Sequence, residues 1–311
     1  MIVGYNAGVQ NILIVGSGDV ARRILRLLAS SAAPRARVYA VLRNPEKAAA
    51  WRDAGARPLI ADLDDPRSLH RLAGLADLVL HLAPPPADGL RDTRTRHLLA
   101  ALSASKRSGG SLPRHLVYVS TTGVYGDCAG AEIDERRRLA ASNPRAVRRV
   151  DAERVLRDWG RRTGVTVSIL RAPGIYAAGR LPVERLQKGL PALVDRDDVF
   201  SNHIHADDLA AACLAALRRG AANRVYNVVD DGELKMADYF DKVADAFGLP
   251  RPPRLARDEL AGVLSPVQLS FMRESRRIGN RRLKQELKLR LAYPTVDAGL
   301  ADAIRRNACS S

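Results

Sequence analysis

The chain has 311 residues, and 46% of them are apolar, which is enough to bury a core without disulfide or metal staples. No apolar run approaches the ~20 residues of a membrane span, the first residues do not resemble a signal peptide, and the 3 cysteines are widely scattered. We therefore expect a cytoplasmic protein without a membrane partner. The net charge is +16, but basic and aromatic residues do not interleave as base-stacking sites require, so the surplus favours an anionic small ligand over nucleic acid.

Short β-like runs alternate with helical stretches through the first half of the chain. The predicted strands cover residues 11–15, 37–42, 58–61, 77–82, 115–120 and 165–170. The predicted helices cover residues 20–29, 45–54, 66–72, 91–105 and 144–162, the last opened by Asn143 and Pro144. Strands joined by helical crossovers predict an α/β protein with a doubly wound parallel sheet of the Rossmann type.

The regularity falls after residue 171. A helix over 206–219, a strand over 224–229 and a helix over 236–247 are predicted, followed by a proline-rich connector at 249–254. The rest is mostly helical and basic. We therefore expect a dinucleotide-binding domain over 11–171 and a smaller, mostly helical substrate lobe over 172–304, of which the part near 204–229 returns to the sheet.

A glycine loop lies directly between the first strand and the first helix, and it consists of Gly16, Ser17, Gly18, Asp19, Val20 and Ala21. Gly16 allows a tight turn, Gly18 lets a pyrophosphate approach the backbone, and Ala21 permits close packing of helix on strand. The helix N-terminus adds free N–H groups and the positive end of a dipole. An ordinary glycine turn is the alternative, but the placement in a βα unit predicts dinucleotide binding.

The end of the second strand indicates which dinucleotide is bound. An NAD-binding protein usually places an acid there for the ribose 2′-hydroxyl, whereas this chain has Arg43 followed by Asn44 and Pro45. A guanidinium suits a 2′-phosphate, which a carboxylate would repel. We therefore favour NADP over NAD, with a solvent-exposed Arg43 of no special role as the alternative.

These features and five further segments resemble the extended and atypical short-chain dehydrogenase/reductases, the NAD-dependent epimerase/dehydratase group. The further segments are ADL at 61–63, HLA at 81–83, VSTTGVYG at 119–126, LRAPGIY at 170–176 and IHADDLA at 204–210. No segment alone identifies the family, but together they do, and the resemblance runs from residue 11 to about residue 300.

The resemblance implies a set of cofactor contacts and one catalytic hydroxyl. Asp62 would meet the adenine amino group, and Thr121 matches the catalytic Ser/Thr that bonds the substrate oxygen during hydride transfer. The remaining implied contacts are Leu63 beside the adenine, Leu82, Ala83 and Pro84 along the path to the nicotinamide ribose, and Pro173 and Ile175 near the nicotinamide.

One departure from the family puts catalysis in doubt. The family carries a YxxxK pair on the helix after the fifth strand, where this chain has Arg145 and Arg149. Arginine stays protonated and is a poor general acid or base at neutral pH. Arg149 can still grip ribose hydroxyls, and Arg145 can clamp a carboxylate, a phosphate or a developing oxyanion. Alternatively, both are ordinary solvated arginines.

Another group would then have to move the proton. Tyr125 and Tyr176 both follow the carboxyl ends of strands, where ligands of open α/β sheets bind. We rank Tyr125 first, with a packed aromatic side chain as its alternative. His203 and His205 precede two aspartates, but this pattern occurs in the family without a metal, so we expect none.

Two functions remain open. The first is an oxidoreductase, epimerase or dehydratase that acts by hydride transfer on a small polar substrate, either anionic or sugar-like, with Arg171, Arg180, Arg276 and Arg277 as candidate anion ligands. The second is a non-catalytic NADP(H) sensor that has lost the Tyr/Lys proton relay. The resemblance also suggests a homodimer through the helices at 91–105 and 145–162.

Overall fold

The computed structural model describes residues 9–30, 36–107 and 110–308. The chain forms two compact units that interleave along the sequence. Unit 1 comprises residues 1–120, 148–170 and 213–224, and unit 2 comprises residues 121–147, 171–212 and 225–311. The sequence suggested a boundary near residue 171 with one later return to the sheet, whereas here residues 121–147 also belong to the second unit.

A seven-stranded sheet has the strand order β12-β7-β5-β4-β1-β2-β3. Its strands are β1 (Asn11–Val15), β2 (Arg37–Leu42), β3 (Ala56–Ile60), β4 (Leu78–His81), β5 (His115–Thr121), β7 (Thr166–Ala172) and β12 (Arg224–Asn227). The pairings β1–β2, β1–β4, β2–β3 and β4–β5 are all parallel. Val15 is in register with Val41 on one side and with His81 on the other, so the loops after β1, β2 and β4 leave the same edge of the sheet.

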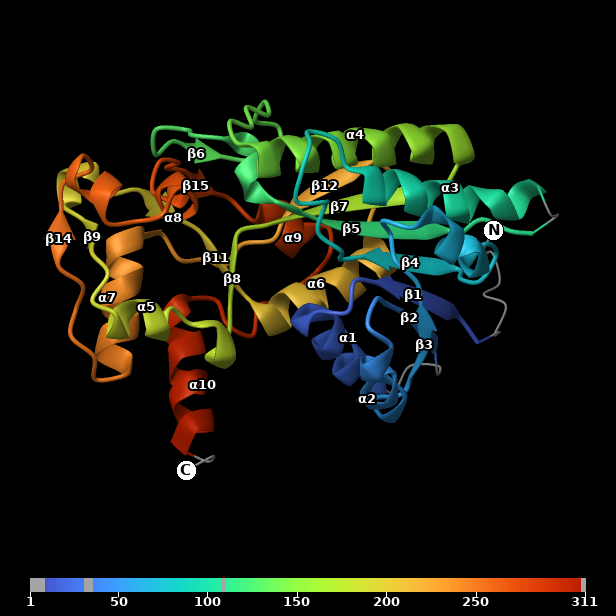
Figure 1. The fold of residues 1–311 in the computed structure, drawn as a ribbon, viewed down its shortest axis with the longest axis horizontal. Helices are drawn as coiled ribbons and strands as arrows, with labels where there is room; N and C mark the ends of the chain where they lie inside the picture. Colours follow the sequence, from blue (N-terminus) through green and yellow to red (C-terminus); the bar gives the residue numbers. More distant parts are fainter. Residues whose placement is uncertain (1–8, 31–35, 108–109, 309–311) are drawn as a thin grey trace. The chain divides into compact units, whose positions relative to one another are not determined.

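The helices that connect these strands cover both faces of the sheet, with α1 and α2 on one side and α3 on the other (Figure 1). They are α1 (Asp19–Ala29), α2 (Ala48–Asp53), α3 (Thr93–Arg107), α4 (Pro144–Thr163) and α6 (Ala206–Arg219), with the 3-10 helices η1 (Pro45–Lys47) and η2 (Pro66–Leu72). This arrangement confirms the predicted doubly wound α/β fold. No helix in the described ranges is long and apolar enough to cross a membrane.

The sequence explains most of these elements. Leu13, Ile14 and Val15 of β1 are completely buried because the strand is covered on both faces. Helix α4 begins where predicted, since the Asn143 Oδ1 accepts a hydrogen bond from the Ala146 N–H at 2.9 Å. Residues 66–72 form a 3-10 helix instead of the predicted α-helix. There the Ser68 hydroxyl, which lies 2.7 Å from the Asp65 carbonyl, competes with the helical backbone bonds.

Unit 2 contains four small two-stranded sheets and several short helices. The paired strands are β8 (Gly174–Tyr176) with β11 (His203–His205), β10 (Phe200–Ser201) with β13 (Leu234–Lys235), β9 (Ala192–Leu193) with β14 (Arg254–Leu255), and β6 (Glu132–Ile133) with β15 (Arg277–Ile278). The helices are α5 (Val183–Gln187), α7 (Met236–Ala246), α8 (Pro266–Phe271), α9 (Arg281–Gln285), α10 (Val296–Ala308), η3 (Thr122–Tyr125), η4 (Ala178–Arg180), η5 (Asp195–Asp197) and η6 (Glu259–Gly262).

A separate hydrophobic core holds unit 2 together. Tyr176, Leu193, Phe240, Val243 and Leu300 are buried in it, so β8, β9, α7 and α10 contribute to the same cluster. The parallel pair β8–β11 places His203 opposite Gly174 and His205 opposite Tyr176. These two strands supply part of the wall of the cavity described below.

Candidate functional site

The glycine loop of unit 1 has one glycine that the fold requires and one that leaves open space. Gly16 has φ +107°, and a Cβ there would lie 2.6 Å from the Ala83 nitrogen. A Cβ at Gly18, the N-cap residue of α1, would meet no protein atom within 4 Å. No side chain caps this helix N-terminus, so no side-chain hydrogen bond competes there with an anion for the first N–H groups of the helix.

The predicted adenine contacts lie on the loop after β3. The Ser68 hydroxyl bonds the Asp62 N–H at 2.9 Å, and the Asp62 carboxylate accepts a hydrogen bond from the Asp64 N–H at 3.0 Å. The Leu63 carbonyl accepts a hydrogen bond from the His97 Nδ1 at 2.7 Å. The loop is thus fixed from within and from α3.

Arg43 directly follows β2, and its side chain is exposed. Asn44 caps η1 through a 2.9 Å bond from the Glu46 N–H, which ends the turn after the arginine. The guanidinium groups of Arg94 and Arg43 both lower the pKa of the Asp64 carboxyl, so Arg43 lies within electrostatic reach of the loop after β3. A cationic side chain in this place fits a 2′-phosphate.

Leu82, Ala83 and Pro84 follow β4 directly, and the Leu82 N–H donates to the Val15 carbonyl at 2.7 Å. The loop after β4 therefore lies against the end of β1, where the glycine loop begins. The residues of unit 1 fit a dinucleotide.

Arg149, which we predicted at the lysine position of the family pattern, donates hydrogen bonds to the end of β5. Its Nη1 donates to the Tyr118 hydroxyl at 2.8 Å and to the Val119 carbonyl at 2.9 Å. Burial raises the pKa of Tyr118 to about 12 despite the neighbouring guanidinium, so this phenol is neutral at pH 7. Arg149 is fixed by one nitrogen and keeps further donors for a ligand.

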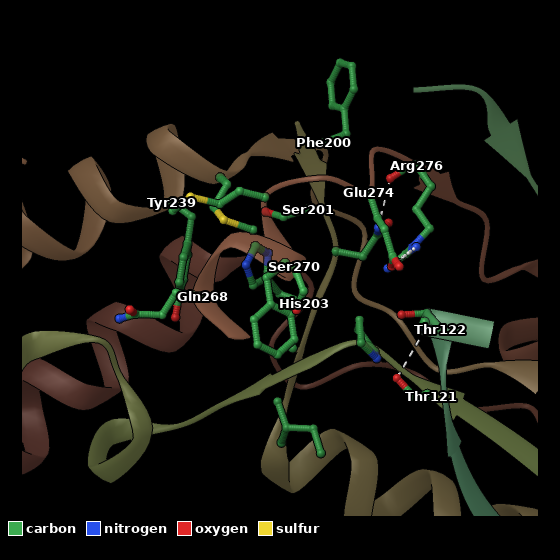
Figure 2. Close-up of a pocket in the computed structure, with 18 of the residues that line it drawn as sticks. Thr121, Thr122, Phe200, Ser201, His203, Tyr239, Gln268, Ser270, Glu274 and Arg276 are labelled. Atoms are coloured by element: carbon green, nitrogen blue, oxygen red, sulfur yellow. Dashed lines mark hydrogen bonds and ion pairs between the residues drawn. The ribbon is translucent and has the colours of Figure 1, made fainter. Parts of the chain in front are cut away.

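A cavity of about 550 Å³ lies within unit 2 (Figure 2). Its lining includes Thr121, which we predicted as the catalytic hydroxyl, and Pro173 and Ile175, which we predicted beside the nicotinamide. The Thr121 Oγ1 accepts a hydrogen bond from the Gly123 N–H at 3.2 Å, which leaves its own proton for another acceptor. Residues from two separate predicted segments therefore share one cavity.

Four arginines line this cavity: Arg145, Arg180, Arg185 and Arg276. The Arg145 guanidinium lies over the Phe271 ring at 4.5 Å, and that of Arg185 lies over Phe240 at 4.6 Å. Of the four arginines proposed as anion ligands, Arg180 and Arg276 line the cavity, whereas Arg171 and Arg277 are not among its lining residues. Buried Arg171 contacts Tyr125, and Arg277 donates to the Gly130 carbonyl.

Glu274 is the carboxylate of the cavity wall, and it ties two segments together. It pairs with Arg276 at 2.7 Å, which is drawn in Figure 2. Its other oxygen accepts hydrogen bonds from Ser142 at 3.2 Å and Asn143 at 3.3 Å, at the start of α4. This network places the first turn of α4, and Arg145 with it, against residues 271–276.

Tyr125 does not line the cavity. It is completely buried, and its hydroxyl lies 2.7 Å from the Asn227 Oδ1 and 2.9 Å from the Arg171 Nη1. It donates to the first and accepts from the second. In this position the hydroxyl has a structural task, and its proposed role in proton transfer stays a prediction. Tyr176 lines the cavity but donates to the Thr295 carbonyl at 3.1 Å.

The two histidines of β11 pack on aromatic rings. His203 lines the cavity with its ring 4.2 Å from that of Tyr239, and His205 lies 3.7 Å from the ring of Tyr293. Burial lowers the pKa of His203 to about 4, so its imidazole is neutral at pH 7. Within residues 9–30, 36–107 and 110–308, no group of three or more His, Cys, Asp and Glu side chains is placed to hold a metal.

Sequence reasoning missed Phe271, Tyr239, Glu274 and the cavity-lining role of His203. One signal was available: Ser265, Pro266 and Gln268 form a capping box that opens α8, the helix that carries Phe271. No local pattern could have paired Glu274 with the start of α4, because the contact joins residues 131 or more apart in the chain.

The glycine loop, the parallel sheet and the open space at the start of α1 define a Rossmann-type dinucleotide-binding protein. The family model described as "NAD dependent epimerase/dehydratase family" matches residues 12–229. The chain therefore belongs to the NAD-dependent epimerase/dehydratase family, and the predicted resemblance to extended short-chain dehydrogenase/reductases is confirmed.

Relatives cover nearly the whole chain. GDP-6-deoxy-D-mannose reductase of Pseudomonas aeruginosa is 29% identical over 288 residues, which is 84% of this chain and 84% of that protein. A functionally unknown conserved protein from Silicibacter pomeroyi DSS has a TM-score of 0.78 and 31% identity, over 96% of this chain and 99% of its own. The structure of RMD from Pseudomonas aeruginosa complexed with NADPH has a TM-score of 0.69 and 25% identity, over 96% and 98%.

Proposed function

We propose that this protein is an NADP(H)-dependent oxidoreductase that acts by hydride transfer on a small polar substrate, anionic or sugar-like. One observation carries the proposal: the cavity of unit 2 is lined both by Thr121, Pro173 and Ile175 and by four arginines. The first group is what the family places around the reacting carbon, and the second is a set of ligands for an anion. A substrate with a carboxylate or phosphate fits this lining.

The cofactor would be held mainly by unit 1. The loop from Gly16 through Ser17 and Gly18 to Asp19 and Val20 would take the pyrophosphate, as its open N-terminus suggests. The further contacts would be Arg43 to the 2′-phosphate, Asp62 and Leu63 to the adenine, Leu82, Ala83 and Pro84 along the ribose path, and Arg149 to the ribose hydroxyls. When bound, NADP(H) supplies or takes the hydride.

The chain's own contribution to the reaction would come from unit 2. Thr121 would donate a hydrogen bond to the substrate oxygen and stabilise the charge that develops there. Arg145, held over Phe271, would clamp a negatively charged group of the substrate in place of the family's tyrosine. This clamp orients the substrate, but it does not move the proton.

The relatives support the choice of ligands. GDP-6-deoxy-D-mannose reductase is named after a GDP-linked deoxy sugar. The structure of RMD is of its complex with NADPH. We infer that this chain takes NADPH in the same way. For the substrate, the short span between Tyr176 and Asp207 also fits a smaller acidic or phosphorylated metabolite, so both classes belong in the test.

The experiment is a titration of the protein with NADPH and with NADH, followed by nucleotide fluorescence, for wild type and Arg43→Glu. We expect tighter binding of NADPH, lost in the variant. Turnover is then measured on GDP-6-deoxy-D-mannose with NADP⁺ and on a panel of carbonyl acids and sugar phosphates with NADPH. Absence of binding by wild type would contradict the proposal entirely.

A second candidate is a non-catalytic NADP(H) sensor. Arg145 at the tyrosine position and the enclosed hydroxyl of Tyr125 favour it. Tight binding of NADPH without turnover on any member of the panel would support the sensor. Cytoplasmic location and a homodimer through α3 and α4 also stay predictions.

A further inference from the structure

The first turn of α3 carries an arginine that reaches two loops of the cofactor site at once. The Arg94 Nε donates to the Asp64 Oδ1 at 2.8 Å, and its Nη2 donates to the Asp64 Oδ2 at 2.6 Å. The remaining nitrogen, Nη1, lies 3.2 Å from the Pro84 carbonyl and 3.3 Å from the Pro85 carbonyl. A bidentate pair of a guanidinium with a carboxylate fixes the arginine side chain more firmly than a single hydrogen bond does.

These two loops are the ones that follow β3 and β4. The first holds Asp62 and Leu63, and the second holds Leu82, Ala83 and Pro84, which together we proposed as the adenine and ribose contacts. His97 lies three residues after Arg94, on the same face of α3, and bonds the Leu63 carbonyl at 2.7 Å. One helix face therefore holds both loops.

We propose that Arg94 is a positioning residue of the cofactor site that also sets the preference for NADP over NAD. It fixes the spacing between the loops after β3 and β4, and it neutralises the Asp64 carboxylate so that Arg43 remains available to a 2′-phosphate. The inference rests on the proposed function, since it assumes that these loops bind a dinucleotide.

The charge argument starts from Asp64, whose side chain is 44% exposed and follows Leu63 directly. Arg94 is the main cause of the lowered pKa of Asp64, and Arg43 contributes as well. Without Arg94, the Asp64 carboxylate would attract Arg43 and repel a 2′-phosphate. If Arg94 acts through charge, its loss should weaken the binding of NADPH more than that of NADH. If it acts only by holding the two loops, its loss should weaken the binding of both nucleotides equally.

The test compares four proteins by NADPH and NADH fluorescence titration and by thermal melting: wild type, Arg94→Ala, Arg94→Ala with Asp64→Asn, and Arg96→Ala. Arg96 is a matched control because it lies on the same helix and makes a similar bidentate pair, with Asp151 at 2.7 and 3.1 Å. Its contact with the loop after β4 is at the Asp92 carbonyl, at the far end of that loop from Pro84 and Pro85. Asp64→Asn alone is added so that the charge argument can be tested even if the Arg94 variants do not fold.

We expect Arg94→Ala to raise the Kd of NADH about tenfold and that of NADPH about fivefold more. The double variant should recover the wild-type ratio of the Kd values of NADPH and NADH, but both nucleotides should still bind more weakly than to wild type. Asp64→Asn alone should increase the preference for NADPH. Arg96→Ala should leave both Kd values within about twofold of wild type.

The outcomes separate the positioning role of Arg94 from its effect on nucleotide specificity. If Arg94→Ala binds both nucleotides as wild type does, Arg94 positions nothing. If both affinities fall equally, or Asp64→Asn leaves the ratio unchanged, the part concerning specificity is wrong. If wild type binds neither nucleotide, the proposed function fails, and this inference fails with it.

Discussion

The two glycines of the nucleotide loop differ in what a methyl group would meet. A Cβ on Gly16 would lie 2.6 Å from a backbone nitrogen in a left-handed conformation, so Gly16→Ala should lower the free energy of unfolding by about 3 kcal/mol. Gly18→Ala meets open space and should leave stability within about 0.5 kcal/mol. Because the new methyl occupies the pyrophosphate's approach, it should weaken NADPH at least about tenfold. Urea unfolding and fluorescence titration measure the two effects, and equal stability losses would contradict the assignment.

Tyr125→Phe tests the hydroxyl that lies between Arg171 and Asn227. Removing it leaves a buried guanidinium and a buried amide each short of one partner, so we expect a loss of about 1–3 kcal/mol in the free energy of unfolding. If the hydroxyl also moves a proton, turnover disappears while NADPH binding is kept. Undiminished turnover per folded molecule would show that its role is structural.

Asp230 is a buried carboxyl whose Oδ2 has no hydrogen-bond partner among the described residues. Burial raises its pKa to about 8, so the folded protein holds a proton that the unfolded chain releases above about pH 4. Its contribution to stability is therefore complete below pH 4 and is lost as the pH rises towards 8. Asp230→Asn should raise the free energy of unfolding by about 4–5 kcal/mol at pH 8 and change it by less than about 0.5 kcal/mol at pH 4. Urea unfolding at both pH values checks this, and an equal effect at both values would contradict it.

The role of a single residue could be predicted from the sequence where it depends on neighbouring residues in the chain. The glycine loop was recognised because six consecutive residues determine its conformation and directly follow β1. The surroundings of Tyr125 were not predictable, because the partners of its hydroxyl come from β7 and β12, far along the chain. Arg145 was found only as a departure from a family pattern, and its contact with Phe271 depends on tertiary packing.

At the scale of elements, long periodic segments were predicted well and very short ones were missed. The bounds of β1, β2 and α6 agree with the prediction to the residue. The eight strands of the small sheets have two or three residues each, too few to show an alternating pattern. They exist because long-range packing brings them together, as when β8 and β11 line one cavity. Consequently the Rossmann sheet followed from sequence, whereas the cavity did not.

Helix α10 packs against β8 through a glycine. Gly299 is inside the helix, where alanine would ordinarily stabilise by about 1 kcal/mol. Here a Cβ would lie 2.4 Å from the Tyr176 ring and 2.7 Å from its hydroxyl, and Tyr176 is buried. We expect Gly299→Ala to destabilise by about 1–3 kcal/mol in urea unfolding. Gly262→Ala, which meets open space, is the control, and a stabilised Gly299→Ala would contradict this packing.

At the scale of the whole molecule, the chain passes between the two units after residues 120, 147, 170, 212 and 224. Unit 1 needs residues 213–224, because the Leu217 carbonyl bonds buried His115 at 3.2 Å and the Ala221 carbonyl bonds Ser168 at 3.1 Å. A fragment ending at residue 171 should therefore show no cooperative unfolding in circular dichroism and no NADPH binding. A folded fragment that binds NADPH would instead support a boundary at residue 171.

The four arginines of the cavity also affect the choice of solution in which the protein is handled. Arginine keeps its charge at every practical pH, and Glu274 offsets the charge of Arg276, so the cavity lining carries a net positive charge that attracts inorganic anions as it would an anionic substrate. Phosphate, sulfate and citrate buffers would occupy those sites and mimic weak inhibitors, whereas chloride at low ionic strength would interfere less. Substrate screens in phosphate-buffered saline would thus hide the anionic compounds that we propose this cavity binds.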